Sequence, residues 1–189
     1  MEAINQQPTI NQFYVNPPKQ EYQTGGSYFS SVDNLIGLID YMKNSFVSNI
    51  ENRKKYLKRL INIGDNWISG ESISPSKNSI SLSTDILEFY KNKFLEGNIN
   101  NDIQNSLTYS PQILLSPIPS GGIYIEFKVK DYTSLSISIN NDAEISFELE
   151  EKGFYSDKEG VTKETVFNEL TQFFNANGYS THSRRRSFI

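Results

Sequence analysis

Hydrophobic and polar residues alternate strictly in three segments of the second half of the chain, at about 122–130, 134–140 and 143–150. A period of two is typical of strands that bury one face of a sheet and expose the other. A run at about 112–116 precedes them among prolines, which restrict it to a sheet edge or a loop. The sequence therefore predicts an antiparallel meander of three or four strands. Its inward residues are Ile123, Ile125, Phe127, Val129, Leu135, Ile137, Ile139, Ile145, Phe147 and Leu149.

The register of this meander depends on its turns, because a shift of one residue exchanges the two faces of a strand. We expect residues 140–142 to form a three-residue loop with Asn or Asp in the left-handed conformation. That loop places Glu126, Ser138 and Glu144 in one outward row. The central strand then exposes only serines, so the outer side of the sheet is predicted to be a shallow serine trough between charged rows.

Hydrophobic residues that recur every three or four positions predict three helices, at about 32–62, 75–96 and 163–176. Gly97 is expected to end the second helix, and the residues from 153 to 160 are expected to form a loop. At about 1.5 Å per residue, the first helix would be roughly 45 Å long. This is more than a domain of this size needs, so the long helix is a candidate for pairing with a second copy in a homo-oligomer.

These elements predict an α+β fold in which the meander packs against helices, as a single domain over residues 31–178. Residues 1–30 are rich in Gln, Asn, Pro and Gly and are predicted to be a flexible N-terminal arm. Residues 179–189 are predicted to be a basic C-terminal tail. Aromatic residues in the arm either pack on the domain or become ordered on a partner protein. The sole tryptophan, in a loop, either anchors the core or contacts a partner. The candidate partner contacts are Phe13, Tyr14, Tyr22, Tyr28 and Trp67.

The charge balance limits the classes of partner. The net charge is -4 and the isoelectric point is about 5.1, which does not favour a general nucleic-acid-binding surface. Basic residues nevertheless gather in the second half of the first helix and in the tail. Each group is either a solvated surface or a contact for nucleic-acid phosphates or an acidic partner. The candidate basic contacts are Arg53, Lys54, Lys55, Lys58, Arg59, Arg184, Arg185 and Arg186.

The amino-acid composition excludes several kinds of catalytic and metal-binding site. The 189 residues include no cysteine and a single histidine, His182. Thiolate nucleophiles, disulfides, and metal sites of cysteine or several histidines are therefore excluded. The sequence indicates no catalytic residue, no metal and no cofactor. No apolar stretch reaches the roughly 18 residues that span a bilayer, and the N-terminus lacks a secretory signal pattern. We therefore expect a cytoplasmic protein that does not contact a membrane.

Three short motifs carry a resemblance to known proteins: Trp67-x-x-Gly70, Pro75-Ser76, and the run from Ser116 to Phe127. The chain resembles a widespread group of small uncharacterised bacterial proteins over about residues 65–149. Those proteins carry a Trp-Asp-Gly-like loop, a Pro-Ser helix start and a Pro-Thr-Pro-x-Gly-Gly-(Ile/Val)-x-(Leu/Ile)-Glu-Trp hairpin. Here Phe127 replaces the final Trp, and Ile68-Ser69-Gly70 replaces the Asp-Gly step. The resemblance implies an α+β fold and a bacterial mobile-element, defence or toxin–antitoxin-like setting, and it implies no catalytic residues.

Three functions follow from these features. The first is a non-catalytic protein that binds another protein encoded nearby, in the manner of an antitoxin; the scarcity of catalytic residue types and the aromatic arm favour it. The second is a nucleic-acid-binding accessory protein that uses the basic helix and tail. The third is a carboxylate- and Mg²⁺-dependent nuclease-like enzyme, because Glu126-Phe127-Lys128 has the letters found in PD-(D/E)xK nucleases. The upstream Asp that such nucleases need has no persuasive counterpart in this sequence.

Overall fold

The structure, a computed structural model, describes residues 31–68, 70–100, 112–130, 133–151 and 153–175. The predicted arm (1–30) and tail (179–189) lie outside the described residues, as does the nearby segment 176–178. The elements, in chain order, are α1 (Ser31–Leu60), α2 (Lys77–Asn100), β1 (Gln112–Pro117), β2 (Ile123–Lys130), β3 (Thr133–Ile139), β4 (Ile145–Glu151), β5 (Phe154–Val161) and α4 (Lys163–Phe174).

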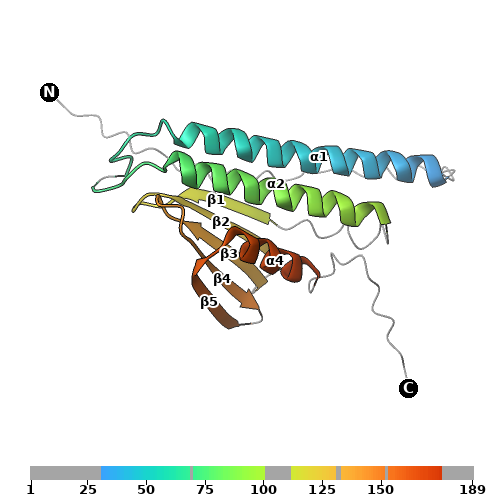
Figure 1. Cartoon of the computed structure of the whole chain (residues 1–189). Helices are drawn as coiled ribbons and strands as arrows, with labels where there is room; N and C mark the ends of the chain where they lie inside the picture. Colours follow the sequence, from blue (N-terminus) through green and yellow to red (C-terminus); the bar gives the residue numbers. More distant parts are fainter. Residues whose placement is uncertain (1–30, 69, 101–111, 131–132, 152, 176–189) are drawn as a thin grey trace, which may run out of the picture.

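The strands form one antiparallel meander in the order β1-β2-β3-β4-β5. Helices α2 and α4 pack side by side on one face of this sheet, and α1 packs along α2 (Figure 1). The predicted α+β fold, with a meander packed against helices and a long first helix, is confirmed. The predicted count of three or four strands is wrong, because the sheet has five.

The core lies between the inner face of the sheet and the helices. The predicted inward residues of the meander are buried there, with Val129 and Leu149 partly buried at its margin. Aromatic rings join the layers: the ring of Tyr90 on α2 lies 5.0 Å from that of Phe127 on β2 and 4.8 Å from that of Phe174 on α4. The period-two pattern therefore identifies the inner face correctly, since alternate residues of a strand share one face.

The fifth strand occupies the segment that was expected to be a loop. Only two residues separate Glu151 on β4 from Phe154 on β5, which are paired, and Gly153 takes a positive φ of 83°. Every residue from 153 to 160 is exposed, so β5 has no apolar face for a period-two pattern to reveal. An edge strand of this kind is held by backbone hydrogen bonds to its neighbour rather than by burial of its side chains.

The turn between β3 and β4 is longer than expected and changes the outward rows. Ile139 pairs with Ile145, and the amide of Asn140 donates to the carbonyl of Glu144 (3.0 Å), so residues 140–144 form a five-residue turn. The left-handed residue is Ala143, with φ 65°, rather than an Asn or Asp. The register of β4 on β3 moves by two residues, and so does that of β3 on β2, where Glu126 pairs with Ser136 rather than with Ser138. Shifts of two residues preserve the inner face. The outward rows are Tyr124–Ser138–Ser146, Glu126–Ser136–Glu148 and Lys128–Ser134–Glu150.

The helix boundaries also differ from those expected. Helix α1 ends at Leu60 and α4 at Phe174, each two residues before the predicted end. Helix α2 begins at Lys77 because the hydroxyl of Ser76 accepts a hydrogen bond from the amide of Ser79 (3.1 Å), which makes Ser76 its cap. The helix then continues through Gly97 to Asn100, since a glycine inside a helix costs only about 1 kcal/mol.

Asn141 ties the β3–β4 turn to the start of α2. Its side-chain amide donates to the carbonyl of Ser74 (2.9 Å), and its Oδ1 accepts from the amide of Ser76 (2.7 Å). On the preceding loop, Asp65 Oδ1 accepts from both the amide and the hydroxyl of Ser74. Trp67 lies on the same loop and is half-buried. We call these five residues the end clamp, because they hold the α1–α2 loop against one end of the sheet.

Candidate functional site

The described helices pack on one face of the sheet and leave the opposite face uncovered (Figure 1). We call this surface, formed by the outward side chains of β2 to β5, the outer face. It follows from the register, because successive side chains of a strand point to opposite faces of the sheet; on β3 the outward Ser134 is nevertheless buried. Its members are Tyr124, Glu126, Lys128, Ser134, Ser136, Ser138, Ser146, Glu148, Glu150 and Asp157.

A shallow open hollow of about 240 Å³ lies on this face over β2 to β5. The hydroxyls of Tyr124 and Ser136 are hydrogen-bonded across its floor (2.9 Å). Glu148, Asp157 and Glu159 contribute carboxylates to its lining. The remaining lining residues are Ser138, Ser146, Phe147 and Lys158.

Lys158 borders the hollow, but its side chain binds to helix α4 on the other face of the sheet. Its Nζ donates to Glu169 on α4 (3.0 Å) and lies 5.3 Å from the centre of the Phe147 ring. The charge of Lys158 is therefore engaged by α4, while Asp157 pairs across the strands with Glu148 on the outer face. The hollow thus combines hydroxyl groups with an acidic border.

Tyr124 stays a neutral phenol on this face. Burial raises the pKa of Tyr124, the hydrogen bond from Ser136 opposes that rise, and the nearby carboxylates of Glu126 and Glu148 add to it. A neutral phenol both donates and accepts hydrogen bonds, as serine hydroxyls do. The floor of the hollow therefore offers polar groups of both kinds to a ligand.

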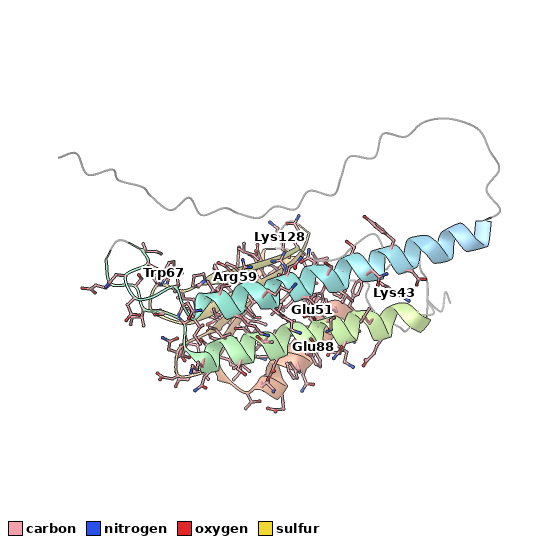
Figure 2. The ribbon with its side chains drawn as sticks, turned by 90° about the horizontal axis from the view of Figure 1, so that it is seen from above. Lys43, Glu51, Arg59, Trp67, Glu88 and Lys128 are labelled. Carbon is pink, nitrogen blue, oxygen red and sulfur yellow. The ribbon has the colours of Figure 1, made fainter. Side chains whose placement is uncertain are left out.

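Four charged residues, Glu51 and Lys54 on α1 with Glu88 and Lys91 on α2, form a network between the two helices. Lys54 Nζ lies 3.1 Å from Glu51 and 2.8 Å from Glu88, and Lys91 Nζ lies 3.1 Å from Glu51 and 2.5 Å from Glu88. Figure 2 shows Glu51 and Glu88 on neighbouring stretches of the two helices. Hydrogen bonds to the lysines lower the pKa of both glutamates, and those to the glutamates raise the pKa of both lysines. Lys54, a candidate basic contact, is thus part of the α1–α2 interface.

Among the other basic candidates of α1, Arg53 is half-buried, and this burial lowers the pKa of its guanidinium. Arg53 Nε donates to Asn49 on the same helix (2.8 Å). Lys55, Lys58 and Arg59 are exposed and make no ion pair with the residues that the structure describes. These three residues, which we call the basic ridge, belong to α1, on the helical side of the molecule (Figure 1). The candidates Arg184, Arg185 and Arg186 lie outside the described residues.

Trp67 is placed beside the end of α1 (Figure 2). Its indole Nε1 donates to the carbonyl of Ile73 (3.2 Å), which closes the loop upon itself. Through this hydrogen bond, Trp67 helps to hold the α1–α2 loop in its conformation. A contact between Trp67 and a partner protein stays a prediction. The aromatic candidates of the arm, Phe13, Tyr14, Tyr22 and Tyr28, lie outside the described residues.

No cluster of three or more Asp, Glu, His or Cys side chains in the described ranges is arranged to hold a metal ion. No helix among them is long and apolar enough to cross a membrane. Glu126 and Lys128, the pair with nuclease-like letters, both lie on the outer face.

Asp157 and Glu159 were not among the predicted site residues, because the sequence pattern predicts a loop where β5 lies. A usable signal was present: Gly153 lies between the strand-like run that ends near Glu151 and the aromatic pair Phe154-Tyr155, and a short Gly-containing gap between strand-like runs indicates a hairpin. Comparisons with protein-family models, curated proteins and solved structures find no match to this chain.

Proposed function

We propose that the protein is a non-catalytic binding protein that docks a basic partner protein on its outer face. The main support for this proposal is the predominantly negative charge of the outer face. Its charged residues are Glu126, Glu148, Glu150 and Asp157, with Lys128 among them. Complementary charge across an interface steers encounter and fixes orientation. The resemblance to bacterial proteins supports the setting, an antitoxin-like or related role in a defence or mobile-element system of the cytoplasm, with the partner encoded nearby.

The hollow supports this proposal through its size and chemistry. Serine side chains on β3 and β4 are short, so a partner's side chain can approach the sheet closely between the longer carboxylates. Carboxylates form strong, charge-assisted hydrogen bonds with Arg and Lys. A basic side chain of the partner, seated between Glu148 and Asp157, would satisfy both carboxylates and contact the Tyr124 hydroxyl.

The basic ridge favours a second candidate, nucleic-acid binding, because Lys55, Lys58 and Arg59 follow one another at helical spacing on an exposed surface. Such a contact would attract phosphates and weaken as salt is added. The nuclease-like alternative uses Glu126 and Lys128, which belong to the outer face rather than to the ridge. The binding and nuclease candidates therefore share the outer face, and only the nucleic-acid candidate depends on the ridge.

Two charge variants separate these candidates. The face variant is Glu148→Gln with Asp157→Asn, and the ridge variant is Lys55→Gln with Lys58→Gln and Arg59→Gln. The full chain and both variants are immobilised and exposed to a lysate of the native host at about 50 mM and 500 mM salt, across which electrostatic contacts are increasingly screened. A retained basic protein is then purified and titrated against all three forms by calorimetry.

We expect the wild-type chain and the ridge variant to bind the same basic protein, and the face variant to bind it at least about tenfold more weakly, as for loss of charge pairs worth roughly 1.4 kcal/mol. Equal binding by the face variant would contradict the proposal. Salt-dependent binding of labelled duplex DNA or single-stranded RNA that is lost only in the ridge variant would favour the nucleic-acid candidate instead. Metal-dependent cleavage lost on Glu126→Gln or Lys128→Gln would favour the nuclease.

A further inference from the structure

Two carboxylates lie directly opposite each other on the outer face. Glu148 on β4 pairs with Asp157 on β5, and like charges in this position destabilise a strand pair. Neither carboxylate makes an ion pair with the residues that the structure describes. In the neighbouring row, by contrast, Glu150 accepts a hydrogen bond from the hydroxyl of Tyr155 (3.0 Å). The fold thus leaves one charge conflict uncompensated, and conflicts of this kind are typical of functional sites.

Lys158 follows Asp157 directly in the chain but does not compensate this pair. Successive side chains of a strand point to opposite faces of the sheet. The Nζ of Lys158 accordingly donates to Glu169 on α4 (3.0 Å) and lies 5.3 Å from the centre of the Phe147 ring. The two carboxylates therefore stay available to a cation from outside the chain.

An aromatic ring lies beside these carboxylates. Tyr124 pairs with Ser138 in the register, but its hydroxyl is hydrogen-bonded to Ser136 (2.9 Å), two residues away along β3. The phenol therefore leans from its own row into the row that contains Ser136, Glu148 and Asp157. The hollow of about 240 Å³ is lined by Tyr124 together with both carboxylates. Negative charge and an aromatic ring thus meet in one depression of the surface.

An arginine side chain fits this combination better than a lysine side chain. Its guanidinium is planar, carries five N–H donors and can bond to two carboxylates at the same time. It also stacks on aromatic rings and is more weakly hydrated than an ammonium, which favours its entry into a hollow that removes part of its water. The ammonium of lysine is a compact, strongly hydrated charge without a flat face.

We propose that the hollow is an arginine site, which selects an arginine of the docked partner over a lysine. The guanidinium lies between Glu148 and Asp157 and against the ring of Tyr124. The arginine site rests on the proposed docking of a basic partner, and it adds the identity of the side chain that the outer face recognises. A single side chain on an exposed surface binds weakly, so the site supplies selectivity within a larger interface.

Short blocked peptides test this selectivity without the partner. The isotope-labelled full-length chain is titrated at low salt with a Gly-Arg-Gly peptide, with its lysine counterpart, and with its citrulline counterpart, in which a neutral urea group replaces the guanidinium. We expect the arginine peptide to shift the backbone amide signals of residues 136, 148 and 157. It should bind at least about threefold more tightly than the lysine peptide, as for one exposed contact between a guanidinium and an aromatic ring. The citrulline peptide should give no saturable shift.

Substitutions locate the site. Glu148→Gln and Asp157→Asn should each weaken binding of the arginine peptide by at least about threefold. Tyr124→Leu should abolish the preference for arginine over lysine, whereas Tyr124→Phe, which keeps the ring, should retain it. The control Glu71→Gln removes the same charge from an exposed loop and should leave binding unchanged. Asp157→Asn should also move the urea midpoint of the free chain to a higher concentration, because it removes the like-charge conflict.

Equal binding of the arginine and lysine peptides would overturn the selectivity, and the absence of a saturable shift at the hollow with either peptide would overturn the site. A lower urea midpoint for Asp157→Asn would contradict the charge conflict on which the site depends. The lysate experiment decides the proposed function separately. A retained basic partner that binds equally well after its arginines are replaced with lysine would uphold the docking and reject the arginine site. Peptide binding as expected, with no basic partner retained, would leave the arginine site standing and reject the proposed function.

Discussion

Gly122 allows the turn between β1 and β2 to lie directly against the turn between β3 and β4. It adopts a φ of 115°, and a Cβ atom built there would collide with the carbonyl oxygen of Ile139. The neighbouring Gly121 faces the side chain of Asn141 in the end clamp in the same way. The Gly-Gly pair, which carries much of the sequence resemblance, thus has a structural reason that is independent of any partner. At the start of β2, the backbone of Gly122 lies directly against the backbone of Ile139, and this approach leaves no room for a side chain.

Replacing Gly122 with alanine should therefore destabilise the protein strongly. We expect Gly122→Ala to lower the free energy of unfolding by at least about 3 kcal/mol, because a strained φ adds to a backbone collision. Gly64→Ala is the matched control: Gly64 also has a positive φ, 74°, but open space around it, so its cost should stay near 1 kcal/mol. Urea unfolding of both variants measures the difference. Equal losses would show that the close approach to Ile139 does not matter.

The β3–β4 turn shows where prediction from residue type fails. Asn140 Oδ1 accepts from the amides of Asp142 and Glu144 (2.9 Å each), which stabilises a five-residue turn. This turn puts Ala143, rather than an Asn or Asp, in the left-handed conformation. The sequence shows that a turn of odd length is needed to keep the apolar residues on one face, and three and five residues satisfy that condition equally. Only the hydrogen bonds of Asn140 distinguish them.

At the scale of elements, α1 and α2 are joined by both polar and apolar contacts. The charge network of Lys54 and its neighbours lies at the margin of an apolar seam that includes the stacked rings of Phe46 and Phe94 (centroids 3.9 Å apart). Periodicity predicts that each helix has a buried side, but it does not say which helix packs against which. For that reason Lys54 could not be separated from Lys55 by sequence, although one lies in an interface and the other is exposed.

Removing Lys54 should destabilise this helix pair in a pH-dependent manner. At pH 7 we expect Lys54→Met to lower the free energy of unfolding by about 1 kcal/mol, as for a partly exposed ion-pair network, and the control Lys55→Met to change it by less than about 0.5 kcal/mol. The folded-state pKa values of Glu51 and Glu88 are lowered from 4.5. Their contribution is therefore present above that value and is lost as pH falls through the folded-state pKa.

The same reasoning applies with the opposite sign to the lysines. The folded-state pKa values of Lys54 and Lys91 are raised from 10.5, so their contribution is complete below that value and is lost as pH rises through the folded-state pKa. The stability difference between wild type and Lys54→Met should thus be largest between these limits and shrink as pH falls below 4.5. Chemical denaturation from pH 3 to 9 measures it. A difference that is constant across this range would mean that the ion pairs of Lys54 do not cause the loss of stability.

Strand β5 marks the limit of the period-two pattern as a predictor. That pattern exists because one face of a strand is buried, and β2, β3 and β4 have such a face under α2 and α4. The exposed edge strand has none, so its polar sequence resembles a loop. The sequence predicts the serines on the central strand of the outer face and charged residues beside them. It does not predict Asp157 and Glu159, which complete the acidic border of the hollow.

At the scale of the whole molecule, the sheet is most firmly held at its centre. Strand β3 lies between two partners and buries Leu135, Ile137 and Ile139 under the helices, whereas β5 has one partner strand and exposed side chains. Local opening requires less free energy where fewer apolar contacts are broken. Hydrogen exchange at low protein concentration should therefore be at least about 100-fold slower for the backbone amides of β3 than for those of β5. Equal protection of the two strands would contradict this gradient.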